Sequence, residues 1–545
     1  MQKPMVKPFA ITLDPGTSLS NHTGSWRTER PVYVHRLPPC NNGCPAGEDI
    51  QGWLFHAESG DYEKAWHSLT ENNPFPAIVG RVCYHPCEAA CNRGQVDESV
   101  SIHAVERFLG DEAIKQHWAF PVPAQKSGKR VLIVGAGPSG LSAAYHLARL
   151  GHAVEIYEAG PMAGGMLRFG IPKYRLPRDI LDAEVARILD MGVKLHLNRK
   201  VENALAAKQE GGFDAVFLAI GAHIAKRAYI PAGAAARVLD AVNVLRDIEA
   251  GEQPLLGRRV VVYGGGNSAI DVARTAKRLG AEEAIIVYRR TRDAMPAHPS
   301  EVHEAEDEGI LFRWLTTITQ ADEGTLTIEK MGMDDKGALL PTGEFETLQA
   351  DSLVLALGQD VDLGLLDNIP GIEIDQGVVK VDPHMMTGCE GIFAGGDMVP
   401  SERTVTVGIG HGKKAARHIH AWLNGEVYAK PTTPPLATLD RINRWYYSDA
   451  PKTVQPELDT VRRMSGFEEV VQGLNADNAL FEARRCLSCG NCFECDNCYG
   501  VCPDNAVKKL GPGKGFEFDY DFCKGCGICV AECPCGAIDM VPEDI

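Results

Sequence analysis

The sequence has no apolar stretch long enough to span a bilayer, and its first residues, MQKPMVKPFAITLDPG, lack the apolar core of a secretory signal. Basic residues are in deficit, because the formal net charge is -17 and the sequence pI is near 5.5. Such a chain presents no broad basic face to a phosphate backbone or to anionic lipid. We therefore expect no nucleic-acid partner and no membrane association.

Cysteine is missing from two long stretches, residues 1–39 and residues 92–388. The second gap leaves no redox-active cysteine pair for the middle of the chain. The 17 cysteines are instead clustered at spacings typical of metal ligands. Together with the length of the chain, this pattern excludes a disulfide scaffold and favours a reducing, cytoplasmic compartment.

Two short cysteine runs lie close to the end of the chain, each with the spacing C-x2-C-x2-C-x3-C-P. This spacing is typical of bacterial-type ferredoxin halves, in which the fourth cysteine of each run crosses to the other [4Fe-4S] cluster. The predicted ligand sets are Cys492, Cys495, Cys498 and Cys533 for one cubane, and Cys502, Cys523, Cys526 and Cys529 for its twin. The alternative is a zinc ribbon, which needs about four thiolates in two knuckles rather than two such runs.

The middle of the chain contains a dinucleotide-binding pattern of strand, glycine turn and helix. Residues 130–134 read as a short buried strand, followed by Gly135, Gly137 and Gly140 and then by an apolar-periodic helix. The first glycine makes the turn, the second lets the backbone approach a pyrophosphate, and the third lets the helix pack on the strand. Glu158 ends the next strand, where a carboxylate can bind ribose hydroxyls. The alternative for Glu158 is a strand-ending surface glutamate.

A second glycine box lies further along the chain, so two nucleotides are implied. Its residues, between a strand and a helix, are Gly264, Gly266, Asn267 and Ser268. The next strand ends in three arginines rather than an acid, namely Arg289, Arg290 and Arg292. Arginines suit a 2'-phosphate better than a free 2'-hydroxyl, which favours NADP(H) over NAD(H). The alternative is that the basic run is a solvated edge.

A third pattern, GIFAGGD at residues 391–397, resembles the strand of two-dinucleotide flavoproteins whose terminal aspartate meets the ribityl chain of FAD. Gly396 and Asp397 are therefore candidate FAD ligands, and the alternative for Asp397 is a turn aspartate. The helix near residues 408–414 would direct its N-terminal dipole at the flavin. Thioredoxin reductase-like and glutathione reductase-like enzymes share this layout but need a cysteine pair beside the flavin, so the cysteine gap excludes them. Electrons must leave the flavin by another route.

Three N-terminal motifs carry a more specific resemblance: CNNGCP from Cys40, NPFPAIVGRVCYHPCEAAC from Asn73, and IHAVERF from Ile102. With the flavin region, from about residue 39 to 420, they resemble the glutamate synthase small-subunit family. Its relatives include the N-terminal part of dihydropyrimidine dehydrogenase and the flavin subunit of the bifurcating ferredoxin:NADP transhydrogenase. The resemblance implies a helical cap with two [4Fe-4S] clusters. It also implies a flavin-lining loop at residues 164–177, with Gly165, Leu167 and Arg168 as candidate FAD contacts.

The resemblance assigns the ligands of the first cap cluster by position. They would be Cys44, Cys83 and Cys87 with Glu106, because one cluster of the family has an unusual carboxylate or amide ligand. A glutamate on a helix face is more often solvated or paired with a neighbour, and Arg107 offers that alternative here.

The second cap cluster has only two ligands at their usual place, Cys40 and Cys91, and two thiolates alone cannot hold a cubane. The family takes the other two from a cysteine pair just before Cys40, where this chain has none. A segment that resembles that lead-in follows the flavin domain instead and ends in Cys486 and Cys489. We therefore predict a permuted cap in which Cys486 and Cys489 complete the set. The alternative is that these two are spare thiols of the ferredoxin module and that Cys40 and Cys91 are merely buried.

The expected fold class is α/β: a two-dinucleotide-binding, Rossmann-like flavoprotein with an N-terminal α-helical Fe-S cap and a C-terminal α+β bacterial-type diferredoxin domain. Cys389 and Cys535 have no assigned cluster and are expected to be structural. The predicted units are the N-terminal Fe-S domain (1–120), the FAD-binding domain in two parts (121–222 and 346–428), the NAD(P)H-binding domain (223–345), a linker with the permuted lead-in (429–485) and the ferredoxin domain (486–545).

Nicotinamide exchanges two electrons as hydride, cubanes exchange one at a time and flavin does both, so FAD belongs between NADP(H) and the four expected clusters. The predicted activity is that of an NAD(P)H-dependent flavin and iron-sulfur oxidoreductase, with no catalytic side chain beyond the cofactor contacts. The first hypothesis, which rests on the resemblance, is the electron-transfer subunit of a thiamine-diphosphate 2-oxoacid:acceptor oxidoreductase. The alternatives are a glutamate synthase small subunit, a free-standing NADPH:ferredoxin oxidoreductase and a non-enzymatic Fe-S scaffold.

Overall fold

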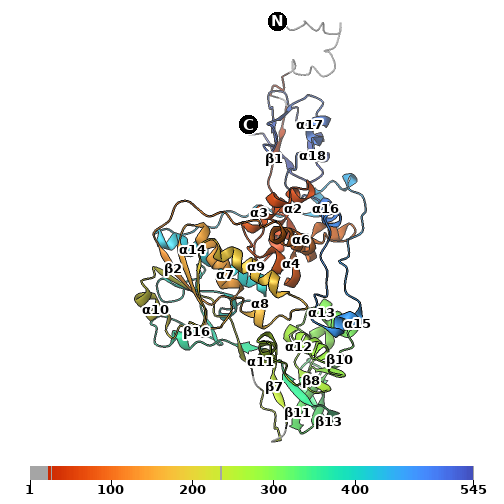
Figure 1. Cartoon of the computed structure of the whole chain (residues 1–545). Coiled ribbons are helices and arrows are strands. Elements are labelled where there is room, and N and C mark those ends of the chain that lie inside the picture. The colour runs from red at the N-terminus through yellow and green to blue at the C-terminus, as the bar shows by residue number, and fades with distance from the viewer. Residues whose placement is uncertain (1–21, 26, 227, 234–235, 544–545) are drawn as a thin grey trace, which may run out of the picture.

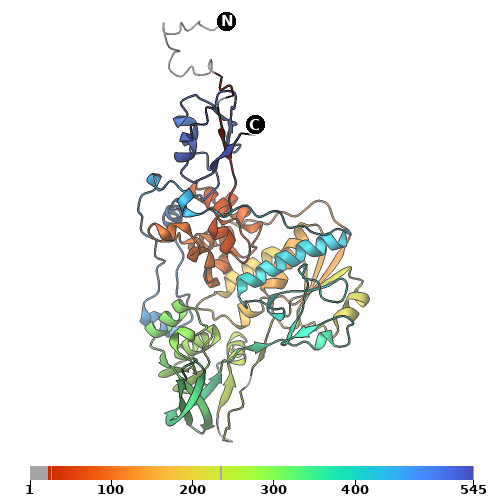
Figure 2. The ribbon, with the colours of Figure 1, turned by 180° about the vertical axis from the view of Figure 1, so that it is seen from behind.

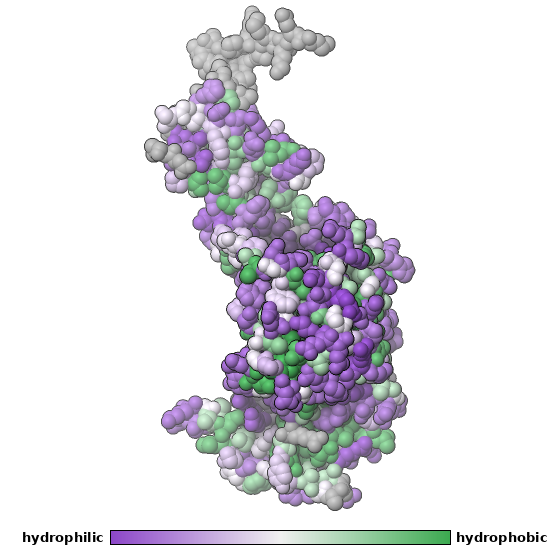
Figure 3. All heavy atoms as spheres, turned by 90° about the vertical axis from the view of Figure 1, so that its left-hand side faces the viewer, coloured by the Kyte–Doolittle hydropathy of each residue, from purple (hydrophilic) through white to green (hydrophobic). Residues whose placement is uncertain are grey.

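The computed structural model describes residues 22–543 apart from residues 26, 227, 234 and 235, so the segment searched for a secretory signal lies outside the described residues. The C-terminal residues form a small module at one end of the molecule, the N-terminal helices lie next to it, and two α/β domains form the rest (Figure 1). Figure 3 shows that the small module stands clear of the body and that the visible face is mostly hydrophilic. Within the described residues, no helix is long and apolar enough to cross a membrane.

The first α/β domain is built on a five-stranded parallel sheet. The elements of this domain are β2 (Arg130–Val134), α7 (Pro138–Arg149), β3 (Ala153–Tyr157), α8 (Met166–Phe169), α9 (Arg178–Leu189), β4 (Lys194–His196), α10 (Ala204–Gly211), β5 (Ala215–Leu218), β16 (Ile374–Asp375), β17 (Val378–Val379), β18 (Ile392–Ala394) and α14 (Val405–Leu423). The strand order is β18-β5-β2-β3-β4. Side chains of β2 alternate between two cores: Val131 and Ile133 pack with α7 and α14, and Leu132 and Val134 face the opposite core. Figure 2 shows α14 lying along α7.

The second α/β domain is inserted between β5 and β18. Its elements are β7 (Val238–Asp240), α11 (Ala241–Glu249), β8 (Arg259–Tyr263), α12 (Asn267–Arg278), β9 (Glu283–Val287), α13 (Pro299–Asp307), β10 (Leu311–Arg313), β11 (Thr316–Asp322), β12 (Thr325–Met333), β13 (Leu339–Gln349) and β14 (Ser352–Leu355). A parallel sheet, β10-β9-β8-β14-β7, has helices on one face and the antiparallel sheet β11-β12-β13 on the other. The chain enters and leaves this domain through the antiparallel pair β6 (Ile224–Ala225) and β15 (Gln359–Asp360).

Six helices from the N-terminal part of the chain form most of the cap between the module and the α/β domains. They are α1 (Pro39–Gly43), α2 (Ile50–Glu58), α3 (Tyr62–Thr70), α4 (Pro76–Val82), α5 (Pro86–Ala89) and α6 (Ile102–Lys115). Two glycines let α4 and α6 cross closely, because a Cβ on Gly80 would lie 2.5 Å from the Cβ of Arg107, and one on Gly110 would lie 2.2 Å from the backbone nitrogen of Ala77. Glu184 of α9 accepts hydrogen bonds from the N–H groups of Ala77 (3.1 Å) and Ile78 (3.0 Å), which fixes the start of α4 on the first α/β domain.

The C-terminal part of the chain returns across all the other units. Helix α15 (Thr460–Ser465) packs on α12, and α16 (Ala476–Arg484) packs on α2 and α6, so the cap is built from both ends of the chain. The terminal module contains α17 (Asn497–Val501), β19 (Val507–Lys509), β20 (Phe516–Phe518), α18 (Ile528–Ala531) and β21 (Ile538–Pro542). Its strand β21 pairs with β1 (Glu29–Tyr33), which comes from the N-terminal segment.

Candidate functional site

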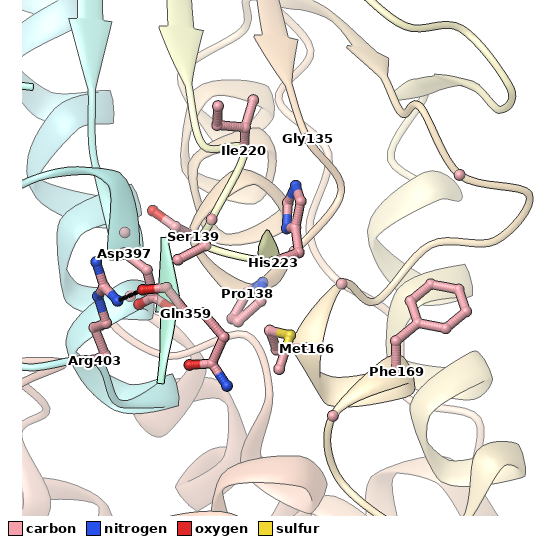
Figure 4. A pocket seen from close by; sticks show the side chains of 18 of the residues that line it. Gly135, Pro138, Ser139, Met166, Phe169, Ile220, His223, Gln359, Asp397 and Arg403 are labelled. Carbon is pink, nitrogen blue, oxygen red and sulfur yellow. Dashed lines mark hydrogen bonds between the residues drawn. The ribbon is translucent and has the colours of Figure 1, made fainter. Parts of the chain in front are cut away.

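A cavity of about 890 Å³ lies where the two α/β domains and the cap meet. Both glycine boxes contribute to its wall, the first through Gly135 and Gly137 and the second through Gly266. Glu158, Asp397 and the loop after β3 complete it on the side of the first domain. Figure 4 shows Ser139, Asp397 and Arg403 on one side and Met166 with Phe169 on the other. A cavity lined by two dinucleotide boxes has the setting that FAD and a pyridine nucleotide require.

The first glycine box fits FAD in its local chemistry. A Cβ on Gly137 would have only the Cα of Gly165 within 4 Å, at 3.9 Å, so the backbone there is open to a close phosphate. The hydroxyl of Ser139 is buried and has no hydrogen-bond partner among the described residues, as expected of a group that a cofactor would satisfy. Glu158 accepts hydrogen bonds from the N–H groups of Ala136 and Gly160, both at 2.7 Å, which orient its carboxylate at the cavity.

The remaining predicted FAD contacts separate into two groups. Gly165, Gly396 and Asp397 line the cavity, and burial raises the pKa of Asp397 while Arg403 opposes the shift. Leu167 and Arg168 do not line it, contrary to the sequence-based prediction. Leu167 packs into the core of the domain. Arg168 donates to the carbonyl of Ala163 (2.7 Å) and pairs with Asp182, so both side chains hold the loop on the side away from the cavity.

Gly140 also acts from outside the cavity, because a Cβ there would lie 2.0 Å from the carbonyl oxygen of Gly135. This close approach brings α7 onto the glycine turn, which is the packing role predicted for the third glycine of such a box.

The second glycine box is arranged in the same way. Gly264 has a φ of +152° and stands beside β14, where a Cβ would lie 2.2 Å from the carbonyl oxygen of Ala356. A Cβ on Gly266 would meet no atom within 4 Å, so this backbone is open to a ligand. Asn267 and Ser268 line the cavity, and the Asn267 side chain accepts from the N–H of His298 at 2.9 Å.

The three arginines predicted to bind a 2'-phosphate lie outside the cavity wall. Arg289 and Arg290 are exposed just after β9. Arg292 forms an ion pair with Glu306 at 2.7 Å. The strand ends at Val287, and the chain turns outward where Tyr288 covers Gly265. These arginines therefore lie at the rim of the nucleotide domain rather than in its cavity.

The first predicted cap cluster lies directly against this cavity. Val82 and Tyr84, the neighbours of Cys83, both line the cavity wall. The sulfur of Cys83 accepts hydrogen bonds from the N–H of His85 (3.3 Å) and from the hydroxyl of Thr406 (3.2 Å) in the first turn of α14. Sequence reasoning missed Thr406, for which only its place just after the flavin-binding pattern gives a signal.

The fourth candidate ligand of that cluster, Glu106, is buried rather than solvated. Burial first, and then the negative charge of Glu48, raise the pKa of Glu106 well above its usual range. Asn73 donates to both carboxylates, at 2.8 Å to Glu106 and 2.9 Å to Glu48. Arg107 pairs instead with Glu469 at 3.0 Å, so the alternative of a Glu106–Arg107 ion pair does not hold. Glu48 is a second buried carboxylate that sequence reasoning missed.

The second predicted cap cluster brings together cysteines from both ends of the chain. Its four candidate ligands line one small hollow: Cys40, Cys91, Cys486 and Cys489. Helix α16, which Cys486 follows, packs on α2 and α6 and so carries the C-terminal pair to the N-terminal cap. The side-chain amide of Asn92 donates to the sulfur of Cys489 at 3.5 Å. The hollow supports the permuted ligand set.

The terminal module groups its cysteines in the crossed pattern of a diferredoxin. One set lines a single hollow: Cys502, Cys523, Cys526 and Cys529. For the other set, burial and then neighbouring thiols, Cys533 among them, raise the pKa of Cys492, Cys495 and Cys498. Cys535 lies outside both sets, with its sulfur 3.8 Å from that of Cys533, and Cys389 packs in the first α/β domain. All 17 cysteines are free, as cluster ligands must be.

Comparison with known proteins agrees with this arrangement. Residues 129–417 match the family described as "Pyridine nucleotide-disulphide oxidoreductase", residues 23–118 match "Dihydroprymidine dehydrogenase domain II, 4Fe-4S cluster", and residues 516–539 match "4Fe-4S binding domain". The chain therefore belongs to the pyridine nucleotide-disulphide oxidoreductase family and carries 4Fe-4S domains towards both ends. This confirms the predicted fold class, the predicted oxidoreductase class and the predicted flavin, pyridine-nucleotide and iron-sulfur cofactors.

Three relatives show more closely which members of this family the chain is similar to. The chain is 36% identical over 504 residues to the NADP(+)-dependent formate dehydrogenase subunit beta of Moorella thermoacetica, covering 83% of this chain and 70% of that protein. It is 33% identical to the NADPH-Fe(3+) oxidoreductase subunit beta of Geobacter sulfurreducens, covering 84% and 77%. It is 33% identical to the glutamate synthase [NADPH] small chain of Azospirillum brasilense, covering 72% and 88%. The predicted kinship with the glutamate synthase small-subunit family is confirmed.

Proposed function

We propose that this protein transfers electrons between NADP(H) and a partner redox enzyme, through FAD and four [4Fe-4S] clusters. One observation carries the proposal: the wall of the dinucleotide cavity includes both neighbours of Cys83, a candidate ligand of the first cluster. Bound flavin exchanges hydride with a nicotinamide and single electrons with cubanes. A cluster against the flavin cavity is therefore a suitable exit for electrons in a domain without a redox cysteine pair.

The protein's own residues organise that exit. Thr404, Val405 and Gly408 of the first turns of α14 line the cavity, so the positive end of this helix faces the flavin position. Thr406, the residue after Val405, donates its hydroxyl to the sulfur of Cys83. The first turn of α14 would therefore contact both a flavin bound in the cavity and a cluster held by Cys83.

A single arginine, whose side chain is 13% exposed, joins the three units that must act together. Arg175, from the loop of the first α/β domain, pairs with Asp271 of α12 at 3.0 Å and with Glu301 of α13. The side chain of Tyr84, from the cap, lies next to Arg175 in the same cavity wall. This contact holds the nucleotide domain against the flavin domain and the first cluster, as hydride transfer requires.

The four ligand sets lie in series from the cavity to the end of the molecule. The set of Cys83 contacts the cavity, and the set of Cys486 shares the short helices α1 and α5 with it. Only Gly490 and Asn491 separate Cys489 from Cys492 of the terminal module. The module stands at the far end in Figure 1. The arrangement supports a route from the nucleotide to an exit on that module.

The identity of the partner enzyme is a separate and more specific proposal. The names of all three relatives describe them as a subunit or a small chain, which supports a catalytic partner here. A thiamine-diphosphate 2-oxoacid oxidoreductase remains our first proposal for it, and a formate dehydrogenase-type catalytic subunit is the alternative that the relative from Moorella favours. Purification of the native complex with mass spectrometry distinguishes the two. A glutaminase-containing large subunit would overturn both, and recovery of the chain alone would favour a free-standing NADPH:ferredoxin oxidoreductase.

We expect NADPH to be preferred over NADH in viologen reduction by the purified holoprotein, by about tenfold or more in kcat/KM, which corresponds to ~1.4 kcal/mol. The physical reason is the exposed pair Arg289 and Arg290 at the rim of the nucleotide domain, just after β9, which would meet the extra phosphate of a dinucleotide that extends beyond the cavity wall. Replacing Arg289 and Arg290 by Gln is expected to raise the KM for NADPH and leave that for NADH unchanged. Equal use of both nucleotides by the unmodified protein would refute this assignment.

A further inference from the structure

The terminal module is completed by a strand from the other end of the chain. Strand β1 pairs antiparallel with β21, with Tyr33 opposite Ile538 and Glu29 opposite Pro542. The residues that flank the strand are also hydrogen-bonded to the module. Val34 donates its N–H to the carbonyl of Ala537 at 3.0 Å, and Glu543 donates its N–H to the carbonyl of Thr28 at 2.9 Å. The N-terminal segment is therefore part of the module that holds the last two clusters.

Tyr33 occupies a specific place within that module. Its hydroxyl lies 3.2 Å from the sulfur of Cys498. Its ring stacks on Phe518, with the ring centroids 4.6 Å apart and an interplanar angle of 15°. The strand pairing and the stacking both restrict the ring, so the hydroxyl is held at the sulfur rather than reaching it by chance. A ligating thiolate carries no proton, so Tyr33 is the donor once Cys498 binds a cluster.

We propose that Tyr33 is a positioning residue that raises the reduction potential of the cubane held by Cys498. A hydrogen bond to a cluster sulfur stabilises the reduced form, which carries more negative charge, and such bonds are among the determinants of cluster potential. The proposal rests on the proposed function, because it requires the C-terminal cubanes. It adds that the N-terminal strand tunes the electron exit, although it lies at the opposite end of the sequence.

The test compares two Tyr→Phe variants of the holoprotein. Each variant removes one hydroxyl group at the contact between β1 and the terminal module. Tyr33→Phe removes the donor to the Cys498 sulfur. Tyr520→Phe removes a hydroxyl that donates to the carbonyl of Pro31 at 2.8 Å and forms no hydrogen bond to a sulfur among the described residues, so it is the matched control. Electron paramagnetic resonance during a redox titration, with iron analysis, measures the midpoint potential of each cubane and the number of clusters.

We expect Tyr33→Phe to lower the midpoint potential of one C-terminal cubane, with full iron content and the other clusters unchanged, and Tyr520→Phe to leave all potentials as they are. An unchanged potential in Tyr33→Phe, or the same shift in both variants, would overturn the role of Tyr33 and leave the proposed function intact. A wild-type protein without C-terminal cubane signals would overturn both.

Discussion

Protein that carries Cys486→Ala and Cys489→Ala is expected to bind about four fewer irons per chain than the unmodified protein, the content of one [4Fe-4S] cluster. Both cysteines line a hollow with Cys40 and Cys91, and the two remaining thiolates cannot hold a cubane. Because the proposed route places this cluster between the flavin and the terminal module, NADPH is expected to reduce the flavin of the variant normally while the C-terminal clusters stay oxidised. Iron analysis and stopped-flow spectroscopy of anaerobically purified protein measure the two effects.

The matched control removes two cysteines that belong to no predicted ligand set. The double variant Cys389→Ala, Cys535→Ala is expected to keep the full iron content, since Cys389 packs in the first α/β domain and Cys535 adjoins Cys533 without belonging to a ligand set. If the Cys486 and Cys489 variant kept all its iron, the permuted ligand set would be wrong, and these two residues would be spare thiols of the terminal module.

The second large effect is expected from single valines in the glycine boxes. Gly266 has φ -90° and ψ 173°, extended values that a valine adopts without strain, and a Cβ there meets no atom within 4 Å. Gly266→Val therefore fits the folded protein, but its side chain occupies the space where the dinucleotide backbone would approach. We expect NADPH-dependent viologen reduction to fall by about 100-fold or more, equivalent to ~3 kcal/mol of lost binding, with FAD and iron contents unchanged.

Gly137→Val is the counterpart in the first box, because Gly137 also has extended backbone values, φ -83° and ψ -177°. This variant is expected to retain its iron but to be purified without FAD. Dithionite should reduce the clusters of both variants. Thermal unfolding of Gly266→Val, followed by circular dichroism, should match that of the unmodified protein, whereas the loss of bound FAD should lower the unfolding temperature of Gly137→Val. Loss of FAD from Gly266→Val, or normal NADPH turnover by Gly137→Val, would contradict the assignment of the two boxes.

The parts that could be predicted from the sequence are those whose signal is local. Each glycine box lies within one strand-turn-helix unit, so its spacing alone predicts where the backbone is open, and both boxes meet at one cavity. The cysteine spacings likewise predict which thiols group in the terminal module. The permuted pair needed one longer step, since two lone thiolates near the N-terminus require two more from elsewhere.

The parts that could not be predicted depend on contacts between distant segments. Strand β1 contains a proline and pairs with residues near the C-terminus, so no local pattern indicates Tyr33. Thr406 reaches Cys83 only because α14 crosses the end of α4. The prediction that Leu167 and Arg168 contact FAD has a related cause. A loop motif indicates which segment lies beside a cavity, but the packing of α8 decides which of its side chains face that cavity.

Anaerobic titration of the holoprotein with NADPH, followed at once by visible absorption and by low-temperature electron paramagnetic resonance, tests the central claim most directly. Since the dinucleotide cavity adjoins the first of the four proposed cluster sites, we expect the flavin absorption to bleach and reduced cubane signals to appear in the same titration. A flavin that bleaches while every cubane remains silent, in protein that dithionite can still reduce, would contradict the proposed electron route.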